Sequence, residues 1–154
     1  MIKIERLKKY DEGLAVEMGK LLMQLSTKWD GSPVSREWIE NVLESPWHDE
    51  LVAFDESGKL VAMASMSVVM GAKIIRNAFL EDFVVDAQCR GQGVGTKMWN
   101  AILDWGREKK CKRLEFTASG NEQKAGAGMF YLKKCRDYGS GAGIYDTNFF
   151  RVEL

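Results

Sequence analysis

The feature that most constrains this chain is a stretch with three glycines in five positions, Gly91, Gly93 and Gly95. An apolar run that ends at Val85 precedes this stretch, and an amphipathic pattern that begins at Val94 follows it. Because ordering glycine costs more backbone entropy than ordering any other residue, such a cluster needs a reason. The reason we expect is a ligand that approaches the main chain closely. The sequence therefore predicts a strand, a glycine loop and a helix, with a binding site at the loop.

A helix that begins directly after a glycine loop is suited to bind an anion. The first-turn N–H groups of a helix lack partners within it, and the helix dipole favours negative charge there. Two common phosphate loops do not fit. A Walker A loop requires Gly-Lys followed by Ser or Thr, whereas here Lys97 follows Thr96. A dinucleotide fingerprint requires GxGxxG, but Thr96 or Met98 stands at the third glycine position.

A third kind of loop does fit, and it carries a family resemblance. The run Arg90-Gly91-Gln92-Gly93-Val94-Gly95 resembles the Arg/Gln-x-x-Gly-x-Gly/Ala motif of the GCN5-related N-acetyltransferase (GNAT) superfamily. The position of the run between a strand and a helix also matches that family, as does Phe130-Tyr131 on a later predicted helix. The competing interpretation is a tight glycine turn without a ligand. The resemblance implies an enzyme of the acetyltransferase class.

Hydrophobic periodicity predicts the other elements, whose expected positions are strands near 2–7, 51–54, 60–70, 74–85, 114–118 and 143–154 and helices over 11–26, 36–45, 94–110 and 122–134. On the last helix, Ala125, Met129 and Leu132 are predicted to face inward. The fold class is a mixed α/β (α+β) arrangement. The resemblance implies the GNAT fold, a mostly antiparallel mixed sheet of six to seven strands with helices on both faces. We expect one domain over residues 1–154.

Composition limits the partners of this chain. With 22 basic and 22 acidic side chains the net charge is zero, which disfavours a nucleic-acid partner. The longest apolar stretch, residues 60–72, is interrupted by Ser65 and Ser67 and is too short to span a bilayer. The amino terminus has no apolar core of signal-peptide length. Three scattered cysteines and a single histidine disfavour a disulfide framework or a metal site. We expect a cytoplasmic protein with no metal and no membrane partner.

The resemblance also implies acetyl-CoA as the co-substrate and assigns residues to it. The backbone of the strand before the loop would pair with the pantetheine arm, and the loop amides would hold the pyrophosphate. Arg90 would border the same phosphates, with its guanidinium on phosphate or on loop carbonyls. Asn121 resembles the family asparagine that binds the pantetheine, although it stands further from Tyr131 than is usual. The implied cofactor set is Phe83, Val84, Val85, Arg90, Gly91, Gln92, Gly93, Val94, Gly95, Thr96 and Asn121.

Acetyl transfer to an amine needs a base, a donor for the oxyanion and an acid for the leaving thiolate. Tyr131 aligns with the family tyrosine that serves as the acid; the alternative is a core aromatic. Glu81 and Asp82 are the candidate bases, because two carboxylates in an otherwise apolar strand demand a reason. Strand alternation predicts that they point to opposite faces. Glu81 is the first choice for base or ammonium anchor; the alternative is a carboxylate tied to backbone N–H groups or to Arg113.

The resemblance implies direct attack of a primary amine on acetyl-CoA in a ternary complex. The Glu81–Asp82 pair is similar to that of GNAT members acting on small amines, such as glucosamine-phosphate acetyltransferases, which favours a small, amino-sugar-like acceptor. Trp29, in a loop before Pro33, joins Glu81 as a candidate substrate-binding residue. The alternatives are a protein lysine or N-terminal acetyltransferase and a non-catalytic acyl-CoA sensor. Dimerisation through the carboxy-terminal strands is common in the family, which leaves a homodimer open.

Overall fold

The computed structural model describes residues 1–72, 75–118 and 125–142. Contacts divide the chain into two compact units, Met1–Phe116 and Thr117–Leu154. The first unit contains the sheet and three of the helices, and the second contains the helix α4. The predicted strand over 143–154 and the candidate Asn121 lie outside the described residues. The single domain over the whole chain therefore stays a prediction.

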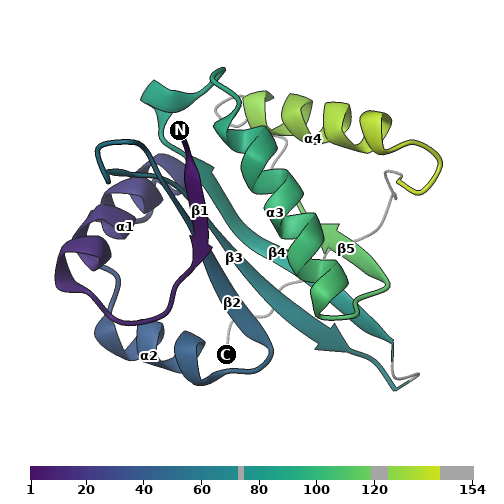
Figure 1. The fold of residues 1–154 in the computed structure, drawn as a ribbon, viewed down its shortest axis with the longest axis horizontal. Coiled ribbons are helices and arrows are strands. Elements are labelled where there is room, and N and C mark those ends of the chain that lie inside the picture. Colours follow the sequence, from purple (N-terminus) through teal and green to yellow (C-terminus); the bar gives the residue numbers. More distant parts are fainter. Residues whose placement is uncertain (73–74, 119–124, 143–154) are drawn as a thin grey trace. The chain divides into compact units, whose positions relative to one another are not determined.

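Five strands form one sheet with the order β1-β2-β3-β4-β5 (Figure 1). The strands are β1 (Lys3–Arg6), β2 (His48–Phe54), β3 (Leu60–Met70), β4 (Arg76–Val85) and β5 (Arg113–Phe116). The pairs from β1 to β4 are antiparallel, and β4 pairs with β5 in parallel. The mostly antiparallel mixed sheet predicted from the sequence is confirmed, with five strands in the described part of the chain.

The helices are α1 (Glu12–Leu25), α2 (Arg36–Glu44), α3 (Val94–Glu108) and α4 (Ala125–Tyr138), and one 3₁₀ turn, η1 (Ala87–Cys89), precedes α3. The Asp11 carboxylate caps α1 by accepting from the N–H of Leu14 at 2.8 Å. The Ser35 hydroxyl caps α2 in the same way. Because such caps satisfy N–H groups that lack helical partners, they fix where these helices begin. Within the described residues, no helix combines the length and apolar character that a membrane crossing requires.

The predicted inward face of α4 is wrong. Met129 is 68% exposed and Leu132 is 46% exposed. The half-buried positions of this helix include Gly128, Tyr131 and Cys135. These three positions follow helical spacing, so the covered face is rotated away from the one that the methionine and leucine indicate. Apolar periodicity indicated the face with Met129 and Leu132, but the large aromatic side chain of Tyr131 lies on the covered face instead.

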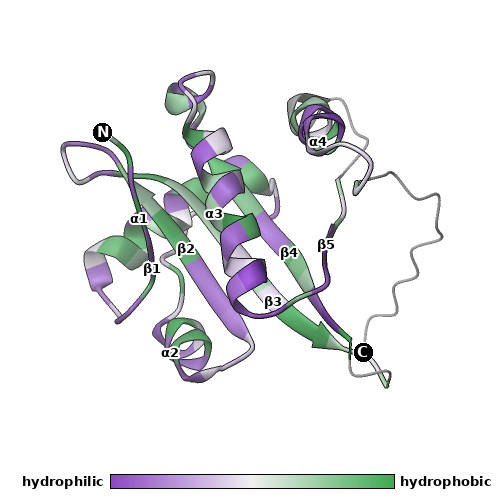
Figure 2. Cartoon of the chain, turned by 45° about the vertical axis from the view of Figure 1, so that its right-hand side comes forward, coloured by the Kyte–Doolittle hydropathy of each residue, from purple (hydrophilic) through white to green (hydrophobic). Residues whose placement is uncertain are grey.

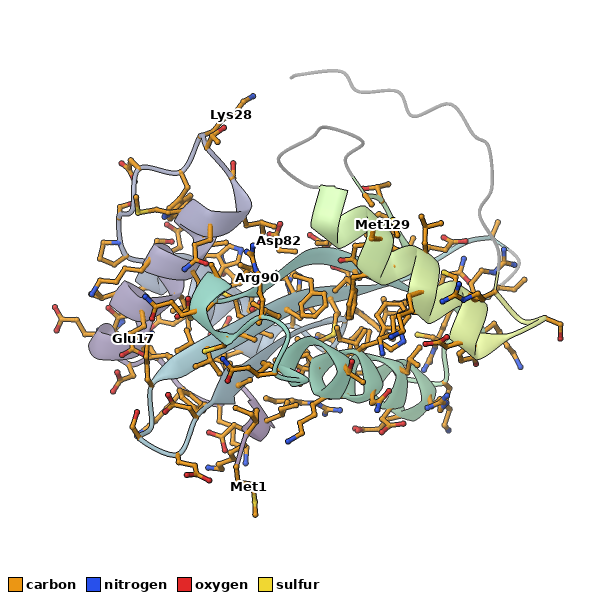
Figure 3. The ribbon with its side chains drawn as sticks, turned by 90° about the horizontal axis from the view of Figure 1, so that it is seen from above. Met1, Glu17, Lys28, Asp82, Arg90 and Met129 are labelled. Carbon is orange, nitrogen blue, oxygen red and sulfur yellow. The ribbon has the colours of Figure 1, made fainter. Side chains whose placement is uncertain are left out.

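Helices pack on both faces of the sheet. Val52, Met63 and Val84 lie opposite one another on β2, β3 and β4 and are buried in a cluster with residues of α1 and α2. On the other face, a Cβ added at Gly106 of α3 would lie 3.6 Å from the Cβ of Ala78. Figure 3, seen from above, shows α1 and α3 on opposite sides of the strands. Because strand side chains alternate, this assigns every regular position of β2 to β4 to a face.

The strands β4 and β5 separate halfway along β4. Their parallel register covers Asn77–Leu80 on β4 and Arg113–Phe116 on β5. From there β4 continues to Val85 while it pairs with β3. The second half of β4 is therefore the segment that leads into the glycine loop.

A bulge interrupts the pairing of β3 with β4 at the same place. Ser65 lies opposite Asp82, but the next residue of β3, Met66, lies opposite Leu80. Glu81 is thus an extra residue on β4. A bulge of this kind re-aims side chains and is over-represented beside active sites.

Candidate active site

The glycine loop has a backbone that favours glycine at two positions. Gly91 has φ 75° and Gly93 has φ 83°, both in the left-handed region. A Cβ at either position would meet nothing within 4 Å, so the backbone conformation, and not crowding, selects glycine. Gly93 is also the N-cap of α3 and supplies no side-chain hydrogen bond. The N-cap residue of α3 therefore leaves the first N–H groups of the helix to other partners, which suits a helix that binds phosphate.

A network of polar side chains fixes the turn between β4 and this loop. Asp86, which is 6% exposed, accepts from the Lys59 ammonium at 2.8 Å and from the N–H of Gln88 at 3.1 Å. The hydrogen bond from Lys59 holds the pKa of the Asp86 carboxyl below its usual value. The side-chain oxygen of Gln24, on α1, accepts from the N–H of Ala87 at 2.8 Å. The start of the loop is thereby tied to both α1 and β3.

Arg90 lies in the turn that follows β4, where Figure 3 labels it together with Asp82 on the strand. Its Nε donates to the carbonyl of Val85 at 3.1 Å. Of the two predicted partners, phosphate or carbonyl, the described bond is to a carbonyl, at the end of the strand. The side chain is exposed, so the rest of the guanidinium faces solvent beside the loop.

Six polar residues form a group on the α1–α2 face of the sheet, which we call the polar row: His48 and Glu50 on β2, Ser65 and Ser67 on β3, and Glu81 and Asp82 on β4. His48 lies opposite Ser67, and Glu50 lies opposite Ser65. Figure 2 shows hydrophilic stretches on β2 and β4, on either side of the mostly hydrophobic β3. No group of His, Cys, Asp and Glu side chains in the described residues has a geometry that could hold a metal ion.

Glu50 is the buried centre of the polar row. Its side chain is 1% exposed; Oε2 accepts from the Ser65 hydroxyl, and Oε1 has no hydrogen-bond partner among the described residues. The pKa of Glu50 is raised to about 8, chiefly by burial and also by the nearby charges of Asp82 and Glu81, while the hydrogen bond from Ser65 opposes the rise. At neutral pH this carboxyl therefore holds a proton.

The two predicted candidate bases share one face, so the prediction that they point to opposite faces is wrong. Asp82 lies opposite Ser65, and Glu81 accepts from the Ser67 hydroxyl on the same face of β3. The bulge causes this, because an extra residue breaks the alternation between them. Both carboxylates are exposed. Arg113, the alternative partner considered for Glu81, instead pairs with Glu115 at 3.6 Å.

Two further predicted site residues come from elements outside the sheet. Tyr131 lies on α4 in the second unit, with its ring edge-on to that of Phe130 at 5.6 Å between centroids. Burial raises the pKa of Tyr131 to about 12, so the phenol keeps its proton at neutral pH. Trp29 is half-buried in the loop between α1 and α2, and its indole N–H donates to the carbonyl of Ser32 at 3.1 Å. Its described hydrogen bonds hold it within its own loop.

Sequence reasoning missed His48, Glu50, Ser65 and Ser67 as a group. The signal was present, because the two serines are two positions apart in an apolar strand, as are the histidine and the glutamate. Polar residues at this spacing share one face of a strand. That the two pairs face each other follows only from the register of β2 with β3.

Comparison with known proteins agrees with the strand, loop and helix described above. A sequence model of the Acetyltransferase (GNAT) family matches residues 17–135. The match covers most of the chain, and the chain therefore belongs to the GNAT family of acetyltransferases, a family that uses acetyl-CoA. A comparison with curated proteins gives no match.

Solved structures with the same fold are distant in sequence. An aminoglycoside acetyltransferase, meta-AAC0020, from an uncultured soil metagenomic sample is 21% identical, with a TM-score of 0.77 over 99% of this chain and 97% of that one. Aminoglycoside N-acetyltransferase AAC(6')-Iy in complex with CoA is 18% identical, with a TM-score of 0.73 over 99% and 95% of the two chains. Ribosomal-protein-alanine N-acetyltransferase from Brucella melitensis biovar Abortus 2308 is 16% identical, with a TM-score of 0.69 over both whole chains. At these identities the likeness concerns the fold.

Proposed function

We propose that this acetyltransferase passes the acetyl group of acetyl-CoA directly to a primary amine of a small, amino-sugar-like molecule. The observation that carries the proposal is the gathering of Glu50, Glu81 and Asp82 on one face, beside the half of β4 that leads into the glycine loop. Amines arrive protonated at neutral pH, and the exposed carboxylates of Glu81 and Asp82 attract them, while the buried Glu50 lies behind these two. Two structures of similar fold are named as aminoglycoside acetyltransferases, and aminoglycosides carry primary amines.

The cofactor would lie along β4 and the glycine loop. The backbone of Phe83, Val84 and Val85 would pair with the pantetheine arm, and the amides from Gly91 to Thr96 would hold the pyrophosphate at the N-terminus of α3. The left-handed glycines and the absence of a side-chain cap at Gly93 support this assignment. Arg90 would border the phosphates, and Asn121 would bind the pantetheine.

In the proposed reaction Glu81 accepts one proton and Tyr131 donates another. Glu81, an exposed carboxylate in the polar row, would take a proton from the acceptor ammonium, directly or through water. The free amine then attacks the thioester carbonyl, the carbon–sulfur bond breaks, and the nitrogen gives its second proton to water as it becomes the amide. Tyr131 would protonate the departing thiolate, a role that needs the protonated phenol which burial maintains. Glu50, already protonated at neutral pH, is less suited to act as the base.

Cofactor binding is tested by the thermal shift of the protein with CoA, acetyl-CoA or NAD at matched concentrations. Because a ligand that binds only the folded state raises its stability, we expect a rise of several degrees, about 3 to 8 °C, with either CoA species and none with NAD. Equal shifts with all three nucleotides, or none, would contradict the assignment of the glycine loop.

Turnover is tested by release of the CoA thiol and by the mass of the product, with three classes of amine. These are sisomicin, glucosamine 6-phosphate and a peptide with an N-terminal alanine. We expect acetylation of at least one of the small amines and a slower reaction with the peptide. A faster reaction with the peptide would favour a protein acetyltransferase. CoA binding without any turnover would favour a sensor.

A further inference from the structure

The chain has one histidine, and it lies in the polar row. His48 is half-buried at the start of β2, with its ring edge-on to that of Trp38 on α2 at 6.0 Å between centroids. Its Nδ1 lies 3.3 Å from the hydroxyl oxygen of Ser67. Its Nε2 is buried and has no hydrogen-bond partner within the described structure. The imidazole is thus connected to the rest of the site through Nδ1.

The strands β2, β3 and β4 are neighbours in the sheet (Figure 1). The side-chain hydrogen bonds that cross them have a definite direction. The Ser67 hydroxyl donates its one hydrogen to Oε1 of Glu81. A carboxylate can only accept, and a hydroxyl whose hydrogen is committed can only accept from its other neighbour. The bond between Ser67 and His48 must therefore be donated by the imidazole. This places a proton on Nδ1 and leaves Nε2 as the bare nitrogen when the ring is neutral.

We infer that His48 and Ser67 are positioning residues that hold the Glu81 carboxylate in the orientation needed to receive the acceptor's proton. The inference rests on the proposed function, because it takes Glu81 as the receiving group. The imidazole Nδ1–H fixes the rotation of the Ser67 hydroxyl, and the hydroxyl fixes Oε1 of Glu81. The second carboxylate oxygen of this exposed side chain then faces the acceptor.

The Glu81 side chain needs these hydrogen bonds because it stands at the bulge of β4. An exposed glutamate on a bulged strand has several rotamers, and catalysis by a base requires one of them. Two hydrogen bonds in sequence, from His48 to Ser67 and from Ser67 to Glu81, restrict the rotation of the glutamate side chain. Ser65, two positions away on the same face, bonds to the buried Glu50 instead and lies outside this chain of bonds.

The test reads the tautomer of the single histidine by long-range ¹H–¹⁵N correlation in protein labelled with ¹⁵N-histidine. At about pH 9, where an imidazole is neutral and carboxylates are charged, we expect the Nδ1–H form in the wild type. Ser67→Ala should shift the ring towards Nε2–H, the form that free histidine prefers. Glu81→Ala should do the same, because it removes the acceptor and leaves the Ser67 hydroxyl hydrogen available to donate to Nδ1. Ser65→Ala is the matched control and should leave the tautomer unchanged.

The kinetic arm uses whichever small amine is acetylated in the turnover test. Ser67→Ala should lower kcat about tenfold or more with an unchanged KM for acetyl-CoA, and Ser67→Thr, which keeps the hydroxyl, should restore most of it. An unchanged tautomer in Ser67→Ala would overturn the inference, as would a shifted tautomer with unchanged kcat. If the tautomers behave as expected but the wild type acetylates no amine, the proposed function fails, and the role in positioning a base fails with it.

Discussion

The two faces of strands β2, β3 and β4 are built from adjacent residues but differ in chemistry. Leu51 and Met66 point towards α3 and are buried among apolar side chains. Their neighbours in the chain, Glu50 and Ser65, point to the other face and bond to each other there. A buried carboxyl with an unpaired oxygen destabilises a fold, whereas buried apolar side chains stabilise it. The comparison indicates that the α3 face is apolar here and stabilises the fold, whereas the polar row interrupts the apolar packing of the α1–α2 face at a cost in stability.

The largest expected effect is on the rate of acetyl transfer. Glu81→Gln removes the group proposed to take the acceptor's proton, so we expect kcat to fall about a hundredfold or more, in the usual range for a general base. The thermal midpoint should stay close to that of the wild type, because the side chain is exposed. Glu37→Gln, at an exposed position of α2, is the control and should leave kcat unchanged. Equal rates for Glu81→Gln and the wild type would remove Glu81 as the base.

The next effect compares neighbouring residues of β3 on opposite faces. Met66 is fully buried against the α3 side, so Met66→Ala should lower the free energy of unfolding by about 2–5 kcal/mol. Ser65→Ala removes one hydrogen bond and should cost about 1 kcal/mol. Urea denaturation measures both. If the serine substitution proves the more costly, the polar face stabilises the fold and the comparison is wrong.

The stability of the fold should depend on pH through the carboxyl of Glu50. The pKa of Glu50 is about 8 in the folded protein against an ordinary value of 4.5, so between these values the folded state holds a proton that the unfolded chain has lost. The folded state then binds more protons, and stability falls as pH rises, by at most about 1.4 kcal/mol per pH unit. In Glu50→Gln this contribution should vanish, while Glu37→Gln should keep it. Parallel stability curves for wild type and Glu50→Gln from about pH 5 to pH 8 would contradict the buried proton.

The smallest effect is on the cofactor loop. Gly93→Ala places a side chain in the left-handed region, which raises the conformational free energy of the CoA-bound loop by about 1–2 kcal/mol. CoA binding should therefore weaken about five- to thirtyfold. Gly58 has a similar φ of 84° in the β2–β3 turn. Gly58→Ala therefore carries the same strain away from the loop and should leave the affinity for CoA unchanged. Isothermal titration with CoA distinguishes the two variants, and equal losses of affinity would remove the loop from the cofactor site.

The glycine loop was predictable because the backbone conformation that it requires is set by the residues of the loop itself. A left-handed φ at Gly91 and Gly93 selects a residue type directly, and the apolar strand and amphipathic helix on either side are visible in the sequence. The caps at Asp11 and Ser35 are local in the same sense, so the helix starts were also predictable.

The polar row was not predictable because it is assembled across strands. Alternation placed Glu81 and Asp82 on opposite faces, and a single extra residue on β4 puts them on the same one. Nothing in the local sequence states where a bulge falls, since it depends on the partner strand. Glu50 meets Ser65 for the same kind of reason, through a register set by the whole hairpin.

The most direct test measures equilibrium binding separately at the cofactor site and at the acceptor site. Isothermal titration would compare CoA with the best-acetylated amine, each against the wild type and the double variant Glu81→Gln with Asp82→Asn. We expect the affinity for CoA to stay within about twofold, as for independent sites, and the amine to bind at least about tenfold more weakly. Unchanged amine binding in the double variant would contradict the claim that the polar row receives the acceptor.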